Sequence, residues 1–100
     1  MAITSTLSDD KKSLIIKVEG RFDFNALQDF RKSYEKHGKQ ESYILDLEEA
    51  EYLDSSALGM LLALRDYAGG DKSDVRIVNA IPDVKKILTI TKLDELFKIE

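Results

Sequence analysis

Residues 53–70 read LDSSALGMLLALRDYAGG and contain a helix together with its start and stop signals. Asp54, Ser55 and Ser56 are residue types whose side-chain oxygens accept hydrogen bonds from the free amides of a first helical turn. The Gly-Gly pair at the end of the stretch is a typical helix stop. This pattern predicts a helix over residues 56–68 that follows the end of a strand and a hydroxyl-bearing turn.

The apolar residues of this predicted helix cover an arc about twice as wide as the roughly 100° stripe that packing on a sheet requires. The arc is centred on Ala57, Leu61, Leu64 and Ala68 and is flanked by Met60, Ala63, Tyr67, Leu58 and Leu62. We expect Leu61 and Leu64 to pack on the sheet, and part of the surplus to face a partner on an exposed rim. Met60 and Ala63 are the expected partner contacts beside the serines, since a flexible methionine suits a surface that meets more than one partner.

The composition is that of one small folded domain over residues 1–100, with 43% hydrophobic and 34% charged residues. A net charge of -4, from 19 acidic and 15 basic residues, offers no basic surface for a phosphate backbone, so nucleic-acid binding is disfavoured. The chain has no cysteine, which is typical of a reducing compartment. It lacks a secretion signal and any apolar stretch near the ~20 residues that span a bilayer. We therefore expect a cytoplasmic protein without direct membrane insertion.

The rest of the chain predicts strands that alternate with helices. Strands are expected at residues 3–7, 13–19, 42–47 and 75–79, with a turn and a closing strand within 93–99. Further helices are expected from an Asn25 cap to about Gly38, and from Pro82 onward with Val84, Ile87, Leu88 and Ile90 buried. Residues 20–24 break the strand pattern, and residues 48–52 form an acidic connection. Right-handed crossovers then predict an α/β fold: a mixed, mostly parallel sheet with an N-terminal hairpin and helices packed on it.

The sequence shows no convincing catalytic constellation. His37 is the only histidine and lies beside lysines at the end of a polar helix, as a solvated residue would. The acidic residues resemble a magnesium site only loosely, because a charge run next to a turn is usually a solvated edge. These residues are Asp46, Glu48, Glu49, Glu51 and Asp54. With no phosphate-cradling glycine motif either, we expect no enzyme activity, no cofactor and no metal.

The serines at residues 55 and 56 allow two interpretations. Aspartate and serine ahead of an apolar helix are most often caps. A phosphate placed there would nevertheless meet free amides and the positive end of the helix dipole, so the fold would tolerate it. It would also set about -1.5 to -2 charges against an apolar rim, which a partner would not easily bury. The residues alone therefore predict a small α/β interaction domain that is open to a phosphorylation switch.

Motifs along nearly the whole chain resemble the STAS domain family, the group of sulfate transporter tails and bacterial anti-sigma factor antagonists. Residues 53–59, preceded by 43–47, resemble its signature. Residues 20–23, Gly-Arg-Phe-Asp, resemble its glycine-x-hydrophobic-aspartate turn, and residues 81–99 resemble its third helix and closing strand. The resemblance implies a single STAS domain over residues 1–100.

The resemblance also implies a function. In single-domain antagonists of this family, the first serine after the aspartate is phosphorylated by an anti-sigma serine kinase and dephosphorylated by a metal-dependent serine phosphatase; here that serine is Ser55. The unphosphorylated antagonist binds the kinase or anti-sigma factor and releases the sigma factor. Asp23 and Asp54 are implied to lie beside Ser55 in the docking surface, and Ser56 is expected to contact the partner with them. The sequence departs from the family at Ala57, where many members have glycine, and ends before the family's usual last helix.

Other functions remain open at this point. A STAS accessory subunit of a membrane transporter or lipid-transport complex would bind its partner constitutively. The output of a partner switch need not be a sigma factor, since a signalling enzyme suits the same docking logic. A small nucleotide-binding domain is a third class, against which the absence of a phosphate loop argues. The sequence makes no prediction of the oligomeric state.

Overall fold

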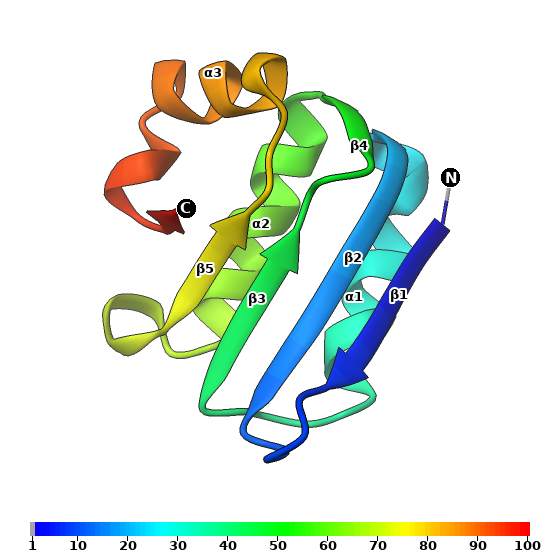
Figure 1. Ribbon diagram of the computed structural model, residues 1–100, viewed down its shortest axis with the longest axis vertical. Coiled ribbons are helices and arrows are strands. Elements are labelled where there is room, and N and C mark those ends of the chain that lie inside the picture. The colour runs from blue at the N-terminus through cyan, green and yellow to red at the C-terminus, as the bar shows by residue number, and fades with distance from the viewer. Residues whose placement is uncertain (1) are drawn as a thin grey trace.

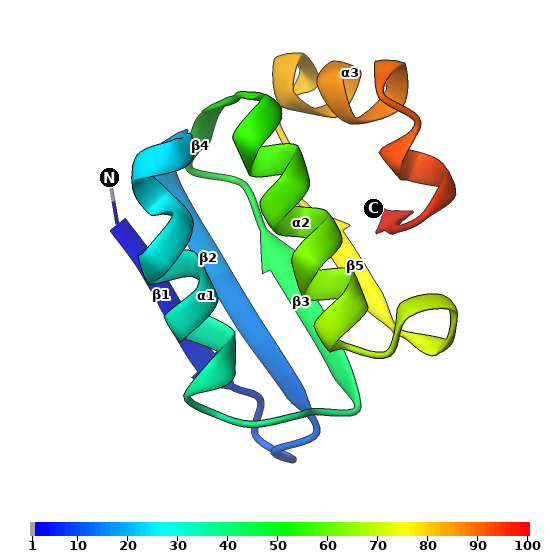
Figure 2. The same ribbon diagram turned by 180° about the vertical axis from the view of Figure 1, so that it is seen from behind.

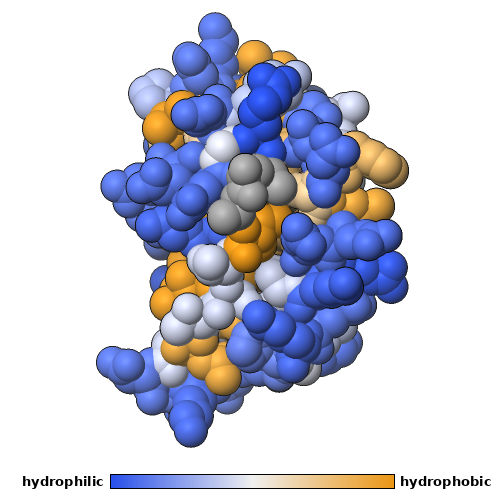
Figure 3. Space-filling model, turned by 90° about the vertical axis from the view of Figure 1, so that its right-hand side faces the viewer, coloured by the Kyte–Doolittle hydropathy of each residue, from blue (hydrophilic) through white to orange (hydrophobic). Residues whose placement is uncertain are grey.

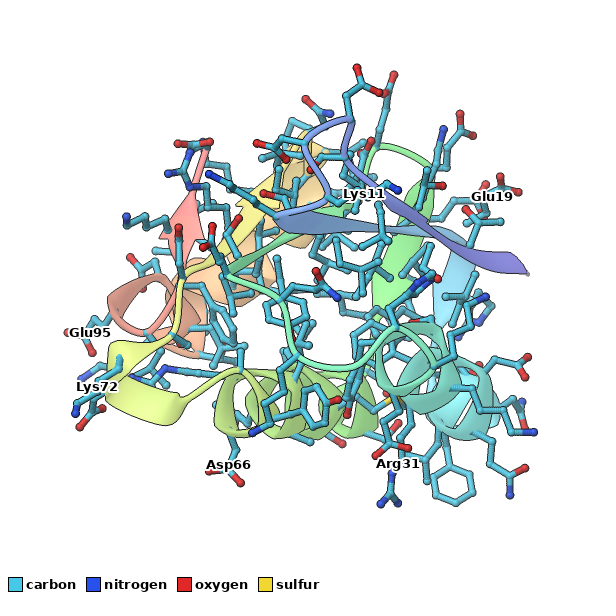
Figure 4. All side chains as sticks on the ribbon, turned by 90° about the horizontal axis from the view of Figure 1, so that it is seen from below. Lys11, Glu19, Arg31, Asp66, Lys72 and Glu95 are labelled. Carbon is cyan, nitrogen blue, oxygen red and sulfur yellow. The ribbon has the colours of Figure 1, made fainter. Side chains whose placement is uncertain are left out.

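The computed structural model describes residues 2–100 and contains a six-stranded sheet with α1 and α2 side by side on one of its faces (Figures 1 and 2). The strands are β1 (Ala2–Leu7), β2 (Ser13–Phe22), β3 (Ser42–Asp46), β4 (Ala50–Leu53), β5 (Val75–Val78) and β6 (Lys98–Ile99). The helices are α1 (Leu27–Glu35), α2 (Ser55–Tyr67) and α3 (Pro82–Ile90), with short 3-10 turns at Phe24–Ala26, Gly70–Lys72 and Leu93–Glu95. Seen from below, α1 and α2 form a second layer beneath the sheet (Figure 4).

The sheet confirms the predicted mixed, mostly parallel arrangement. Its strand order is β1-β2-β3-β5-β6, with β4 paired to β2 beyond the end of β3. β1 and β2 form the expected antiparallel hairpin, and the other pairs of the described strands are parallel. The alternation that predicted β2 is explained by burial, because Leu14, Ile16 and Val18 point into the core beneath the sheet while the residues between them point to the open face.

The end of β2 differs from the prediction. The strand continues to Phe22, because Gly20 adopts a positive φ of 82° and the register shifts between Gly20 and Arg21. Phe22 then pairs with Leu53 of β4. The predicted acidic connection therefore contains a strand, which alternation did not reveal because β4 is buried only at its first and last residues.

The start of α1 also differs from the prediction. The side-chain cap is Asp23 and not Asn25: the Asp23 carboxylate accepts a hydrogen bond from the Asn25 amide at 3.0 Å and begins a 3-10 turn. α1 continues from that turn after Ala26 and has no side-chain cap of its own. α1 ends at Glu35, three residues before Gly38. β2 extends to Phe22, so Asp23 is the first residue after the strand and its carboxylate can accept from the amide two residues later.

The helices confirm most of the expected core. Leu61 and Leu64 of α2 are fully buried, as are Val84 and Leu88 of α3. The expectation that Ile90 is buried is wrong, since its side chain is 68% exposed. Ile90 lies two residues after Leu88, roughly 200° around the helix from the buried stripe, and so faces away from the sheet. No helix within residues 2–100 has the length and apolar character needed to cross a bilayer.

Candidate functional site

The N-terminus of α2 is capped by Asp54. One carboxylate oxygen, Oδ1, accepts hydrogen bonds from the Ala57 amide at 3.0 Å and from the Ser56 hydroxyl at 2.6 Å. These bonds hold the pKa of the Asp54 carboxyl below its ordinary value, with the Ser56 hydroxyl as the largest cause and the Ala57 amide next. Asp54 is therefore ionised at neutral pH and fixed in place by the turn that it caps.

The two serines of the motif have different surroundings. The Ser56 hydroxyl is half-buried and is committed to Asp54. Ser55 is the first residue of α2 and is exposed. Within residues 2–100, no side-chain hydrogen bond engages the Ser55 hydroxyl. Ser56 is thus part of the cap, whereas the Ser55 hydroxyl lies at the surface and takes no part in the cap.

Asp23 lies at the same edge of the sheet as Asp54. Phe22 and Leu53 are partners in the parallel pairing of β2 and β4, and the Asp54 amide donates a hydrogen bond to the Phe22 carbonyl at 3.3 Å. The two aspartates directly follow these paired residues. The Phe24 amide, in the turn that Asp23 caps, also helps to lower the pKa of Asp54. The pairing therefore places the backbones of Asp23 and Asp54 at the same edge of the sheet, with Ser55 directly after Asp54.

Met60 and Ala63 lie on the flank of α2 that faces α1. Both line a groove of about 390 Å³ between these helices, together with Phe30 and Tyr34 of α1. The expected exposed rim is wrong for Met60, whose side chain is only 3% exposed, whereas Ala63 is exposed. α1 covers this flank of α2, and the rings of Tyr34 and Tyr67 lie 5.0 Å apart across the helix pair.

The charged rim of the same groove points away from the sheet. Arg31 projects from α1 and Asp66 from α2 on the outer side of the helix layer (Figure 4). Arg31 also pairs with Glu35 one turn later on α1, at 3.1 Å. The groove is therefore apolar at its base and charged at its opening.

The profile of the STAS domain family matches residues 4–100. This chain belongs to the STAS domain family. A STAS-domain-containing protein of Pseudomonas aeruginosa (strain UCBPP-PA14) is 52% identical over 100 residues, which is 99% of each chain. The implied family and fold are confirmed.

Solved structures share the fold at lower identity. The anti-sigma factor antagonist SpoIIAA in its unphosphorylated form is 19% identical, with a TM-score of 0.82 over 99% of this STAS domain and 88% of that chain. SpoIIAA of Bacillus in its phosphorylated form is 16% identical, with a TM-score of 0.71 over 99% of this STAS domain and 91% of that chain. A putative anti-sigma factor antagonist from Thermotoga maritima is 20% identical, with a TM-score of 0.83 over 97% and 84%.

Two exposed aromatic residues near the candidate site of this STAS domain were not predicted from the sequence. Phe24 directly follows Asp23, and its side chain is 68% exposed. Tyr52 of β4 is also exposed and lies beneath the Arg21 guanidinium, which is 4.4 Å from the centre of the ring. Periodicity gave no signal for either, because each lies in a short segment without alternation. Both add apolar surface next to the two aspartates.

Asp46, one of the acidic residues considered for a metal site, is engaged in hydrogen bonds with the protein. Asp46 Oδ1 accepts hydrogen bonds from the Glu48 amide at 3.0 Å and from the Asn79 side-chain amide at 3.3 Å. Among residues 2–100, no three or more histidine, aspartate or glutamate side chains are grouped so as to hold a metal ion. His37 is half-buried, with its Nε2 3.3 Å from the Ser5 hydroxyl of β1.

Proposed function

We propose that this STAS domain is a cytoplasmic, non-enzymatic antagonist of an anti-sigma factor with serine kinase activity, and that phosphate on Ser55 ends the interaction. The observation that carries the proposal is the exposed, uncommitted Ser55 hydroxyl at the first residue of a capped helix. Membership of the family and likeness to SpoIIAA, which has solved unphosphorylated and phosphorylated forms, support it. A metal-dependent serine phosphatase would restore the binding form.

The fold accommodates a phosphate at this position. The N-terminus of α2 supplies the positive end of a helix dipole, and the first-turn amides that Asp54 does not engage remain available as donors. Modification of the Ser55 hydroxyl breaks no hydrogen bond with any of the described residues. Phosphorylation is therefore expected to change the surface and not the fold.

The neighbouring carboxylates make the modified surface costly to bury. A partner that covers Ser55 together with Asp23 and Asp54 would have to desolvate a phosphate of about -1.5 to -2 charge next to two negative groups. A penalty on the order of a few kcal/mol corresponds to at least a hundredfold loss of affinity. Exposed Phe24 supplies apolar contact area on the same side, and this area would contribute to the affinity of the unphosphorylated form for its partner.

The proposal is tested by capture from a bacterial extract on immobilised wild type, Ser55→Ala, Ser55→Asp and Ser56→Ala, with the bound proteins identified by mass spectrometry. We expect one serine kinase on wild type and Ser55→Ala and none on Ser55→Asp. Ser56→Ala is the matched control: it loses the hydroxyl bonded to Asp54 and some thermal stability, but it keeps the kinase.

Incubation with that kinase and ATP then locates the phosphate. We expect modification of wild type and Ser56→Ala at Ser55, and none of Ser55→Ala. Phosphate on Ser56, or on neither serine, would overturn the assignment. Equal capture of one partner by all four variants would instead support constitutive binding, as expected of an accessory subunit of a transporter or lipid-transport complex. The effector that the captured kinase releases shows whether the output is a sigma factor or a signalling enzyme.

A further inference from the structure

β1 forms one edge of the sheet and, within the described residues, pairs only with β2. The hairpin closes with a hydrogen bond from the Ser8 amide to the Ser13 carbonyl. Backbone groups alternate in direction along an antiparallel pair, so those of Thr4 and Thr6 point toward β2. The backbone groups of Ile3, Ser5 and Leu7 point away from β2 in the plane of the sheet, where they form a template for another strand.

This edge lacks three features that often prevent strand addition, namely charged side chains, proline and a β-bulge. Residues 2–7, AITSTL, contain no charge and no proline, and the pairing with β2 has no register shift. Ile and Thr also favour strands. Figure 3 looks directly at this side of the molecule: a pale and orange strip runs below the grey residue, between blue, hydrophilic surfaces.

We propose that β1 pairs antiparallel with β1 of a second copy of this chain, about a two-fold axis at Ser5. This inference goes beyond the proposed function, because it concerns self-association at a different surface. The outward backbone groups of Ser5 face their own copies across the axis, and those of Ile3 face those of Leu7. The pairing joins the two sheets into one continuous sheet with a shared open face.

Burial restricts the register independently, because the two-fold axis must pass through a residue and not between two residues. Ile3, Ser5 and Leu7 are half-buried on the helix side, whereas Thr4 and Thr6 are exposed on the open face. Opposite residues of an antiparallel pair must point to the same side. A centre at Ser5 places Ile3 opposite Leu7 and Thr4 opposite Thr6, while a centre between two residues would set half-buried side chains opposite exposed ones.

The strand is self-complementary but short. Two neutral strands meet no like-charge repulsion, and cross-strand threonine pairs are favourable. Five paired residues extend for only about 17 Å, which is little for an interface expected to reach about 1,200 Å². The dimer is therefore reversible and depends on concentration. α1 lies between β1 and α2 (Figure 2), so the dimer leaves the Ser55 site uncovered.

Sedimentation velocity across a concentration series of the full chain tests the proposal with two charge variants. The wild type is expected to approach twice the 11.3 kDa mass of one chain as concentration rises. T4K/T6K sets lysines opposite each other across the axis and should be monomeric. The lysine at position 4 also lies opposite Lys17 of β2, so any fall in melting temperature should be shared by T4K/T6E. T4K/T6E is the matched control: it sets lysine opposite glutamate in this register and should dimerise, with a dependence on salt.

Mixing provides a second readout of the register. T4K/T6K and T4E/T6E are each expected to be monomeric and to form a heterodimer when combined, because every exposed pair across the axis is then of opposite charge. A wild type that is monomeric at every concentration would overturn the proposal. A dimer that persists in T4K/T6K, or is lost equally in T4K/T6E, would overturn the pairing at Ser5.

Discussion

Met60→Lys should unfold this STAS domain, whereas Ala63→Lys, three residues later on the same helix, should leave it folded. The Met60 side chain is 3% exposed and lies at the base of the groove that Phe30 and Tyr34 also line. Burial of a methionine side chain contributes about 1.5–3 kcal/mol, and an ammonium group in the same site adds a penalty of roughly several kcal/mol. Their sum is comparable with the about 5–15 kcal/mol that stabilise a small domain.

Urea unfolding followed by circular dichroism measures this contrast. Met60→Lys is expected to lose cooperative unfolding or to lower its midpoint by more than half, while Ala63→Lys should stay within about 0.5 kcal/mol of wild type. Met60→Leu conserves volume and should cost less than about 1.5 kcal/mol. Ala63→Lys should instead weaken capture of the kinase. A wild-type midpoint for Met60→Lys would refute the packing of α1 against this flank of α2.

Three further outcomes are expected from the fold. Gly20→Ala should destabilise the domain by about 1–2 kcal/mol in urea unfolding, because alanine resists the positive φ of 82° at this position. Leu88→Ala should cost about 2–5 kcal/mol, whereas Ile90→Ser should change the unfolding free energy by less than about 0.5 kcal/mol. The pKa of Asp54 is lowered from 3.8 in the folded state, so its contribution to stability is full above pH 3.8 and is lost as the pH falls through the folded-state value. Acid unfolding of Asp54→Ala, followed by circular dichroism, should lack this component.

The helix that carries the site was predictable because its signals are local. Asp54 caps α2 through its own first turn, and Gly69 follows the last turn with a φ of 123°, so the bounds differ from the prediction by one residue at each end. β4 was not predictable in this way. Its four residues form a strand only because Gly20 redirects the end of β2 toward them, and Gly20 lies about thirty residues earlier in the chain.

The burial of Met60 is likewise a property of the neighbouring helix. A helical wheel orders the residues of α2 by angle, and Met60 and Leu62 lie on opposite flanks of the same apolar arc. Only the position of α1 makes one flank buried and leaves Leu62 exposed on the other. The width of the arc correctly predicted that some apolar surface would remain outside the core. Which flank that would be depended on packing between helices, and the wheel contains no information about it.

Ser55 and Ser56 are equivalent by residue type, and their difference comes from the cap. A phosphate on Ser56 would have to break the 2.6 Å bond from its hydroxyl to Asp54 and hold a dianion against that carboxylate, so the switch would weaken the helix that displays it. A phosphate on Ser55 disturbs no bond of the cap, since the Ala57 amide and the Ser56 hydroxyl keep their shared acceptor. The helix start would then be the same in both states, and the change of charge would be confined to the surface that a partner contacts. In the proposed switch, Asp54 and Ser56 would therefore hold the position of Ser55 while remaining unmodified.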